Sequence, residues 1–419
     1  MTIGFGTSLA FDSSRNPRIG NFYRRPSAPS AGTIIFNVAD RELQGWNGTS
    51  WVSLTTSGTE VGQAWGNGGV GQLGENVPPT NRNSPVSVVG FTDWTQFAAG
   101  EQHSLGVRPN GTLWAWGFNY AGLLGINADI TASRSSPVSV LGGFTDWISV
   151  GAGRYHSLGI RSSGGMWAWG NGNSGKLGNN STVTASSPVS VVGGFTDWIM
   201  VEAADQHTVA IRSNGTAWSW GSSSTGQVGS GVFAYISSPV SVLGGFTDWI
   251  HVSCGREHTV GVRRAGSMWA WGNGNYGQQG SNNVTAVTSP VSVVGGFTDW
   301  ILSASWRYGS AGLRSNGTIW TWGRGTVGQL GDNQTLVLRS SPVSIVGGFT
   351  DWVFVNSGRE HLAAIRAGGS LWAWGRNSNQ QLGNASSLDA SSPVSVVGGF
   401  TDWVSVVPGG NFTLAIRST

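Results

Sequence analysis

The tetrapeptide Phe-Thr-Asp-Trp occurs seven times in this chain, and this repeat limits the possible folds more than any other feature. Its phenylalanines are Phe91, Phe144, Phe195, Phe246, Phe297, Phe349 and Phe400. A Trp-Gly pair recurs in step with it, at Trp65, Trp116, Trp169, Trp220, Trp271, Trp322 and Trp374, with 51 to 53 residues between successive copies. Ser-Pro-Val precedes every Phe-Thr-Asp-Trp. A repeat of this length indicates one structural unit that is stacked on itself seven times.

Each unit predicts four short strands. In the unit that begins at Trp147, the alternating and β-branched segments are residues 147–152, 156–161, 166–169 and 188–192. In this last segment the proline is expected at the first strand position, where its missing N–H does least harm. The turn between the second and third strands contains Asn-Gly in several units, which is a strong hairpin signal. Four antiparallel strands per unit are typical of a β-propeller blade.

The two ends of the repeat predict how the ring closes. The chain enters the repeat at a third strand, residues 61–65, and leaves it after a second strand, residues 412–417. The C-terminus therefore supplies the first two strands of the blade that the N-terminus began. Such a composite blade leaves no free sheet edge. We predict an all-β fold, a seven-bladed propeller over residues 61–419 with a composite closing blade.

The residues before the repeat differ in composition and predict three segments. Residues 1–30 are rich in arginine and proline and are expected to form either a flexible tail or an extended arm that orders on a partner. Residues 31–54 predict a small three-stranded β module with an Asn-Gly hairpin, and residues 55–60 a linker. So short a module cannot bury its own apolar residues. We therefore expect it to dock on the propeller, on copies of itself or on another protein, through Ile34, Phe36, Trp46 and Trp51.

Charge and cysteine content exclude several classes of protein. Only 10% of the residues are charged, the net charge is +3, and Lys176 is the single lysine. This argues against a nucleic-acid surface, which needs clustered lysine and arginine. A single cysteine, Cys254, excludes a disulfide framework and a thiolate metal site. Residues 1–20 lack a long apolar core, so we expect no signal peptide, no membrane insertion and synthesis in a cytoplasm.

No pattern in the sequence predicts catalysis. Five histidines, His103, His156, His207, His258 and His361, hold one equivalent place per unit. They lie one blade apart and cannot converge on a metal, so we expect each to satisfy main-chain groups near its own turn. The aspartates of Phe-Thr-Asp-Trp are expected to cap their own turns. Without an acid–base pair, a nucleophile with partners or a phosphate loop, we predict no catalytic residue, no metal, no cofactor and no enzyme activity.

The useful signal for binding comes from comparing the units. Turns between the first and second and between the third and fourth strands share one face of the disk, and they vary. The turns of the other face are nearly identical. Arginine and aromatic residues in exposed loops are typical of recognition surfaces, although neutral variation of solvated loops is the alternative for any one residue. The candidate binding residues are Arg154, Tyr155, Arg256, Trp306, Arg307, Tyr308, Arg359, Phe118, Tyr120, Phe233, Tyr235 and Tyr276.

Two resemblances bear on function. The segment from Trp169-Gly170 to Leu177-Gly178, the following Ser-Pro-Val and the segment Gly255-Arg-Glu-His258 resemble the repeat of the regulator of chromosome condensation family, over residues 61–419. That resemblance implies a seven-bladed propeller. It does not extend to guanine-nucleotide exchange, because no unit carries an inserted wedge. Residues 31–54 resemble short modules of bacteriophage tail fibres and other virion proteins.

Together these features predict a non-enzymatic structural and recognition protein, a phage virion component such as a tail fibre, spike or decoration protein. Residues 1–54 would attach it to other virion proteins or form a homo-oligomer. The variable face would bind a host-surface protein or glycan, with no nucleic acid and no membrane insertion. The alternative is a soluble, cytoplasmic propeller that binds another protein as a regulator or inhibitor.

Overall fold

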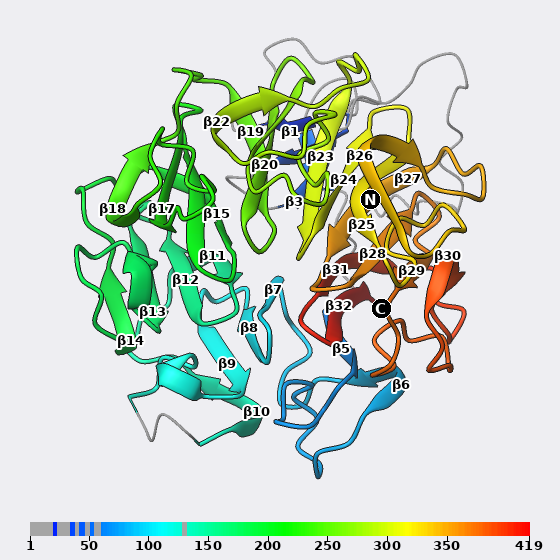
Figure 1. Cartoon of the computed structure of the whole chain (residues 1–419). Coiled ribbons are helices and arrows are strands. Elements are labelled where there is room, and N and C mark those ends of the chain that lie inside the picture. The colour runs from blue at the N-terminus through cyan, green and yellow to red at the C-terminus, as the bar shows by residue number, and fades with distance from the viewer. Residues whose placement is uncertain (1–19, 23–33, 38–41, 47–50, 54–59, 128–131) are drawn as a thin grey trace. The chain divides into compact units, whose positions relative to one another are not determined.

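The computed structural model describes residues 20–22, 34–37, 42–46, 51–53, 60–127 and 132–419 (Figure 1). The chain divides into two compact units, Met1–Ser57 and Gly58–Thr419.

The described strands of the first unit form a sheet with the strand order β1-β2-β3-β4. Its strands are β1 (Gly20–Phe22), β2 (Ile34–Asn37), β3 (Glu42–Trp46) and β4 (Trp51–Ser53). β2, β3 and β4 pair antiparallel, whereas β1 pairs parallel with β2. This sheet therefore includes a strand from the segment predicted to be an arm. The attachment candidates Ile34, Phe36, Trp46 and Trp51 lie in β2, β3 and β4, and their side chains lie outside what the structure describes.

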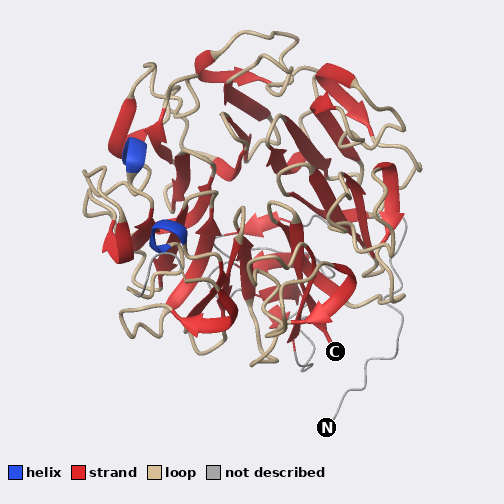
Figure 2. Cartoon of the chain, turned by 60° about the horizontal axis from the view of Figure 1, so that its bottom comes forward, coloured by secondary structure: helices blue, strands red, loops and turns tan. Residues whose placement is uncertain are grey.

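The second unit is a ring of seven four-stranded antiparallel sheets (Figures 1 and 2). We number these blades 1 to 7 and label their strands A to D from the axis outward. The A strands of neighbouring blades contact each other around the axis, for example β19 with β23. The predicted seven-bladed fold is confirmed.

Blades 1 to 3 follow one another along the chain. Blade 1 consists of β7 (Gln96–Ala99), β8 (His103–Val107), β9 (Leu113–Gly117) and β10 (Arg134–Ser139). Blade 2 consists of β11 (Trp147–Ala152), β12 (His156–Arg161), β13 (Met166–Gly170) and β14 (Ala185–Ser190). Blade 3 consists of β15 (Trp198–Ala203), β16 (His207–Arg212), β17 (Ala217–Ser222) and β18 (Tyr235–Ser241). The C–D loops of blades 1 and 2 contain short 3-10 turns, η1 (Tyr120–Gly122) and η2 (Asn173–Gly175).

Blades 4 to 6 continue the same order. Blade 4 consists of β19 (Trp249–Cys254), β20 (His258–Arg263), β21 (Met268–Gly272) and β22 (Val287–Ser292). Blade 5 consists of β23 (Trp300–Trp306), β24 (Gly309–Arg314), β25 (Ile319–Gly325) and β26 (Val337–Ser344). Blade 6 consists of β27 (Trp352–Ser357), β28 (His361–Arg366), β29 (Leu371–Gly375) and β30 (Ala390–Ser395).

Blade 7 is the predicted composite blade. It consists of β31 (Trp403–Pro408), β32 (Phe412–Ser418), β5 (Glu60–Gly66) and β6 (Arg82–Ser87). β32 and β5 pair over their whole length, from Phe412 opposite Gly66 to Ser418 opposite Glu60. Main-chain hydrogen bonds between the two ends of the propeller therefore close the ring, as the sequence predicts.

The D strands begin earlier than predicted. β14 starts at Ala185, three residues before Pro188, so the expectation that this proline opens its strand is wrong. The register against β13 shifts between Ala168 and Gly170, which marks a bulge. Proline is tolerated there because an outer edge strand with a bulge needs fewer ladder N–H groups.

Apolar side chains fill the space between neighbouring blades. Trp147 and Trp169 of blade 2 are 2% and 0% exposed, and they pack with Leu105 and Ala115 of blade 1. The two indoles meet edge-on, with ring centroids 6.1 Å apart. The tryptophans of the repeat therefore join one blade to the next, which explains why each unit needs its neighbours to fold.

A hydrogen-bonded relay crosses each of these boundaries. In blade 2, Ser157 Oγ and Trp169 Nε1 both donate to the carbonyl oxygen of Leu123 in blade 1, at 2.9 Å each. Because the Ser157 hydroxyl donates its only proton there, it accepts from Nε2 of His103 in blade 1, at 2.8 Å. The equivalent histidine bonds join His156 to Thr208, His207 to Thr259, His258 to Ser310 and His361 to Thr413.

The histidines therefore bond across the blade boundary, and the expectation that they satisfy main-chain groups near their own turns is wrong. Their Nδ1 atoms are buried, and within the part of the chain that the structure describes they have no hydrogen-bond partner. Burial lowers the pKa of His258 to about 3, so the ring is neutral. Nothing in the sequence reveals the partner, because it lies 52 residues further along the chain.

The face formed by the B–C turns and the linkers between blades is nearly the same in every blade, and we call it the uniform face. It carries a second repeated contact. In blade 2, Arg161 Nε donates to Asp146 Oδ1 at 2.7 Å, and its guanidinium carbon lies 3.9 Å from the centre of the Phe144 ring. We call this arginine–aspartate–phenylalanine group the clasp, and all seven blades have one. The expectation that the aspartate carboxylate caps its own turn is wrong. Its carboxylate pairs with the arginine that ends strand B.

Candidate functional site

The A–B turns form the inner part of the varying face. Each lies between strands A and B, and the residue two positions before strand B is Glu101, Arg154, Asp205, Arg256, Arg307, Arg359 or Gly410 in blades 1 to 7. Main-chain bonds link turns of neighbouring blades, for example Arg307 N–H to the carbonyl of Arg359 at 3.2 Å. We call the A–B turns and C–D loops together the variable face.

Ion pairs connect most of the charged residues in these turns. Arg154 Nη1 lies 3.3 Å from Asp205 Oδ2, and Arg256 Nε lies 3.7 Å from the same oxygen. Arg359 pairs with Glu101. Burial raises the pKa of both carboxyl groups, Glu101 and Asp205, although their arginine partners lower it. The inner part of the variable face, around the propeller axis, therefore carries both positive and negative charges.

Arginines and tyrosines gather where blade 5 meets blade 4. The rings of Tyr276 and Tyr308 are 4.8 Å apart between centroids, and Arg324 lies 5.5 and 5.4 Å from them. Arg307 lies 4.8 Å from the Tyr308 ring, and Arg256 Nη1 donates to the Tyr308 hydroxyl at 2.8 Å. We call these five residues the blade-5 cluster. They unite three predicted A–B turn residues with one predicted loop tyrosine.

A second aromatic group lies on blades 1 and 2. Phe118 and Tyr120 stack at 6.1 Å, and Tyr120 meets Tyr155 edge-on at 6.3 Å. Arg154 lies 4.8 Å from the Tyr155 ring. Lys176 Nζ lies 5.9 Å from the same ring. Four of the predicted residues therefore make direct contact here.

The remaining predicted residues are dispersed. Phe233 and Tyr235 of blade 3 are 61% and 71% exposed, and no ring contact joins them to either group. Arg359 is held by Glu101 beside the axis. Trp306 is only 1% exposed, so it is not a surface residue.

Trp306 has a packing role that the sequence analysis missed. Its indole fills the place that the imidazole occupies in other blades, since a Cβ on Gly309 would lie 2.1 Å from the Trp306 ring. Blade 6 has Leu362 where other blades have the hydroxyl that bonds the histidine. At this boundary the histidine and its hydroxyl partner are therefore both absent, whereas Phe412 replaces the histidine of blade 7 although Ser104 of blade 1 keeps the hydroxyl.

Arg324 is the principal surface residue that the sequence analysis missed. It stands two residues after Trp322, a place that is asparagine in blades 2, 4 and 7. Arg324 is found when the residue at this position is compared among the seven units, and it is missed when only aromatic residues are sought. The same comparison finds Arg376 of blade 6, which pairs with Glu360.

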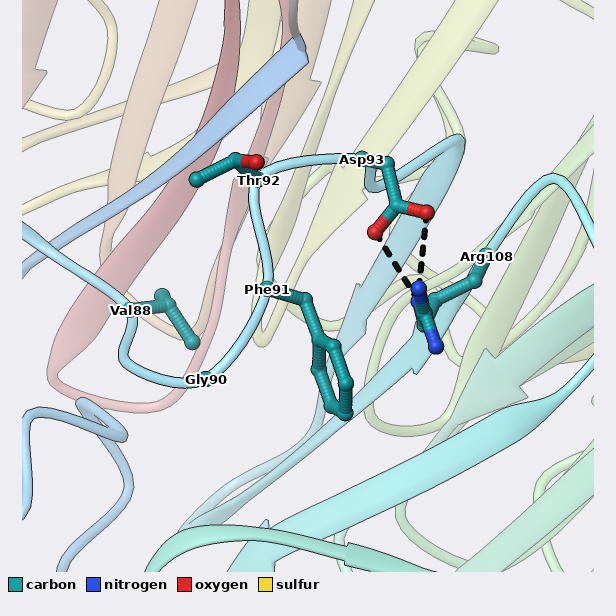
Figure 3. A pocket seen from close by; sticks show the side chains of 6 residues that line it. All are labelled: Val88, Gly90, Phe91, Thr92, Asp93 and Arg108. Atoms are coloured by element: carbon teal, nitrogen blue, oxygen red, sulfur yellow. Dashed lines mark hydrogen bonds and ion pairs between the residues drawn. The ribbon is translucent and has the colours of Figure 1, made fainter.

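A hollow opens on the opposite face beside blade 1 (Figure 3). It is lined by Val88, Gly90, Phe91, Thr92, Asp93 and Arg108. The linker before Phe91 has one glycine where the linkers of other blades have two. In those other linkers the first of the two glycines packs against the phenylalanine. Arg108 and Asp93 already satisfy each other through two bonds of 2.9 Å. The hollow therefore offers no free charged group.

The described part of the chain contains no group of three or more histidine, cysteine, aspartate or glutamate side chains arranged to hold a metal ion. In these same residues, no helix has the length and apolar character needed to span a membrane.

Comparison with known proteins identifies relatives of the propeller. The family model for the RCC1-like domain matches residues 60–415. The ultraviolet-B receptor UVR8 of Arabidopsis thaliana is 28% identical over 341 residues, which cover 79% of this chain and 76% of that protein. The regulator of chromosome condensation of Xenopus laevis is 26% identical over 408 residues, 88% and 95% of the two chains.

These relatives show that the virion interpretation is wrong. They are a receptor and a regulator, and they give no support to a tail fibre, spike or decoration protein, to virion partners or to a virion location. The resemblance of residues 31–54 to phage modules gains no support either. Its physical weakness is its length, because some two dozen residues with a common hairpin signal carry little specificity. The alternative, a propeller that binds another protein, agrees better with these relatives.

The solved structures agree on the fold. Prp20p of Saccharomyces cerevisiae superposes with a TM-score of 0.77 at 20% identity, covering 87% of this chain and 93% of that one. The sevenfold repeat, the ring of seven blades and the match over residues 60–415 together show that this chain belongs to the RCC1-like domain family.

Proposed function

We propose that this propeller binds another protein through its variable face and acts as a regulator or inhibitor of that partner, in the cytoplasm. The observation that carries the proposal is the contrast between its two faces. Seven clasps make one face nearly uniform, whereas the C–D loops and most A–B turns of the other face vary among the blades and gather arginine and tyrosine. A scaffold with a single recognition surface is expected to have one constant face and one variable face.

The relatives support a binding role. Prp20p is described by its binding properties to Gsp1p and histones, and a second structure of it is a complex with Kap60. These partners belong to that protein. For this chain we propose only the class, a protein partner, and binding rather than catalysis. Residues 31–54 remain candidates for attachment to a partner or for self-association.

The test uses matched variants on the two faces. Full-length protein, Tyr155→Ala on the variable face and Arg264→Gln on the uniform face are each immobilised and exposed to an extract of the cells that express the protein. Arg264 is an exposed residue of a B–C turn, so its loss leaves the core intact. We expect Tyr155→Ala to lose specific partners that the wild type and Arg264→Gln retain. Equal retention by all three proteins would contradict the proposal.

A further inference from the structure

We propose that the blade-5 cluster, Tyr276, Tyr308, Arg256, Arg307 and Arg324, binds an acidic side chain of a partner protein and is the anchor of the variable face. This inference rests on the proposed function, because it names the place and the chemistry of the recognition that the variable face performs.

Unpaired positive charge is the first observation. Arg154, Arg256, Arg359 and Arg376 on this face each have a carboxylate within ion-pair distance. Within residues 60–127 and 132–419, Arg307 and Arg324 have none. Arg307 Nε is also buried, and it has no hydrogen-bond partner among the described residues. A guanidinium offers five donors, and a buried donor without an acceptor is costly, so these two residues are prepared to receive an anion.

Prior positioning is the second observation. Both guanidinium groups lie against the Tyr308 ring, Arg307 at 4.8 Å and Arg324 at 5.4 Å. Tyr308 is itself held by the 2.8 Å bond from Arg256 and by contact with Tyr276. The turn beneath it is fixed by the buried Trp306. The arginines therefore lose little side-chain freedom on binding, which is the usual cost of a surface ion pair.

The surroundings favour a carboxylate over a nucleic-acid backbone. Glu101, Asp205, Glu257 and Glu360 lie among the same A–B turns. A polyanion that crosses this face would meet these acids as well as the arginines, whereas one carboxylate can reach Arg307 and Arg324 alone. Bidentate arginine–carboxylate pairing is among the strongest polar contacts at interfaces.

An apolar patch adjoins the cluster and points to a protein segment. β25 and β26 extend their pairing so that Leu338 stands directly opposite Arg324. Leu338 is 58% exposed, and Leu336, in the loop just before β26, is 82% exposed. Residues opposite each other on antiparallel strands have neighbouring side chains. The site therefore fits an acidic residue that has an apolar residue beside it.

The test measures binding of a fluorescein-labelled peptide, Gly-Ser-Glu-Leu-Asp-Glu-Leu-Gly-Ser, to the full chain by fluorescence anisotropy. The matched peptide has glutamine and asparagine in place of the acids. We expect the acidic peptide to bind at least about tenfold more tightly than its amide counterpart. Arg307→Gln and Arg324→Gln should each weaken binding about tenfold, and Leu338→Ser several-fold, while Arg264→Gln leaves it unchanged. A thermal melt of each variant verifies folding.

Several outcomes would overturn the inference. These are no binding of the acidic peptide up to about 1 mM, equal binding of the two peptides, or wild-type affinity in Arg324→Gln. Tighter binding of a phosphoserine version or of a 20-nucleotide single-stranded DNA would assign the cluster to phosphate instead. If cellular partners are lost in Tyr155→Ala but kept in Arg307→Gln and Arg324→Gln, the variable face still binds and only this assignment fails.

Discussion

At the residue scale, the histidines at the blade boundaries link stability to pH. Each is completely buried and neutral, and it donates from Nε2 to a hydroxyl of the next blade. A proton on Nδ1 would find no acceptor among the residues that the structure describes. Protonation must therefore break the contact or unfold the boundary.

Acid should destabilise the propeller through these residues. Burial lowers the pKa of His258 from 6.5 to about 3. A base with a lowered folded-state pKa stabilises fully above pH 6.5 and progressively less as the pH falls from 6.5 toward 3, because the unfolded chain takes up the proton first. We expect His258→Gln to reduce the pH slope of the unfolding free energy by about 1.4 kcal/mol per pH unit in that window. Urea unfolding at pH 7.5, 6.0 and 5.0 measures this.

The pH slope of His258→Gln has to be compared with that of wild type, because buried acids change the unfolding free energy with pH in the direction opposite to histidine. Burial raises the pKa of Glu202 to about 7, so its contribution is lost as the pH rises from 4.5 through 7. That term is common to both proteins and cancels in the difference. Identical pH slopes for wild type and His258→Gln would contradict the assignment.

Lys176 is a second residue with a predictable effect. Five other blades have glutamine at its place, and there the side-chain oxygen accepts from a main-chain N–H two residues earlier, as Gln278 does from Tyr276 at 2.8 Å. Lysine has no acceptor. Burial also lowers the pKa of Lys176 to about 8, so its charged form is disfavoured in the fold.

We therefore expect Lys176→Gln to stabilise the propeller by about 1 kcal/mol at pH 7. The folded-state pKa of Lys176 lies below the usual 10.5. The charged lysine therefore reduces the stability of the fold by its full amount below pH 8, and this reduction disappears as the pH rises to 10.5. The gain should thus shrink between pH 7 and pH 10. Lys176→Leu, which imitates Leu123 of blade 1, is the control that removes the charge without supplying an acceptor. A destabilised Lys176→Gln would refute this account.

At the scale of the element, the clasp joins the end of strand B to the linker that enters the blade. Arg161 and Asp146 are 25% and 30% exposed, so solvent screens their attraction. The Phe144 ring beneath the guanidinium adds a cation–π contact. One clasp should therefore contribute modestly, and its repetition in seven blades matters more than any single copy.

Removing one clasp should cost about 1 kcal/mol. The test is a double-mutant cycle of Arg161→Gln and Asp146→Asn by urea unfolding, with Arg264→Gln as a control that stays within about 0.5 kcal/mol of wild type. Arg314→Gln in blade 5 should add to Arg161→Gln without coupling, because the clasps are separate. A coupling energy of zero within blade 2 would show that the pair is only a geometric coincidence.

At the scale of the whole molecule, the composite blade is the closure on which the ring depends. Deleting residues 404–419 removes all of β32 and nearly all of β31, so β5 keeps β6 but loses its pairing with β32, and blades 6 and 1 lose a neighbour. We expect the shortened chain to aggregate, since free strand edges pair with other chains. Size-exclusion chromatography and a circular-dichroism melt measure this. A soluble monomer with an unchanged Tm would be incompatible with closure by β32.

A rearranged chain supplies the positive control. Ser418 and Glu60 are paired across β32 and β5, so a short Asn-Gly turn can join the two ends as it does in other blades. New ends can be opened at Gly194, where an added Cβ would meet no atom within 4 Å. This permuted propeller, which begins at Gly194 and omits residues 1–59, should fold as a monomer. Its failure would mean that closure needs more than strand pairing.

The sequence by itself determined the blade count, the strand order and the composite closure. Each follows from local marks that repeat in register, such as Trp169-Gly170 and the Asn-Gly turns, and strand alternation is a local property of the chain. It also separated the variable face from the uniform one, because blades can be compared without knowing their positions in space.

The tertiary structure alone decided which residues meet. The partner of His103 is Ser157 in the next blade, and Arg324 meets Tyr276 across the boundary between blades 5 and 4. The exposed aromatic candidate Trp306 proved to be buried because it fills the space that the imidazole leaves empty in blade 5. The periodicity within one unit gives a residue's place in its own blade. Hydrogen bonds, ion pairs and burial depend on the neighbouring blade, which only the closed ring brings into contact.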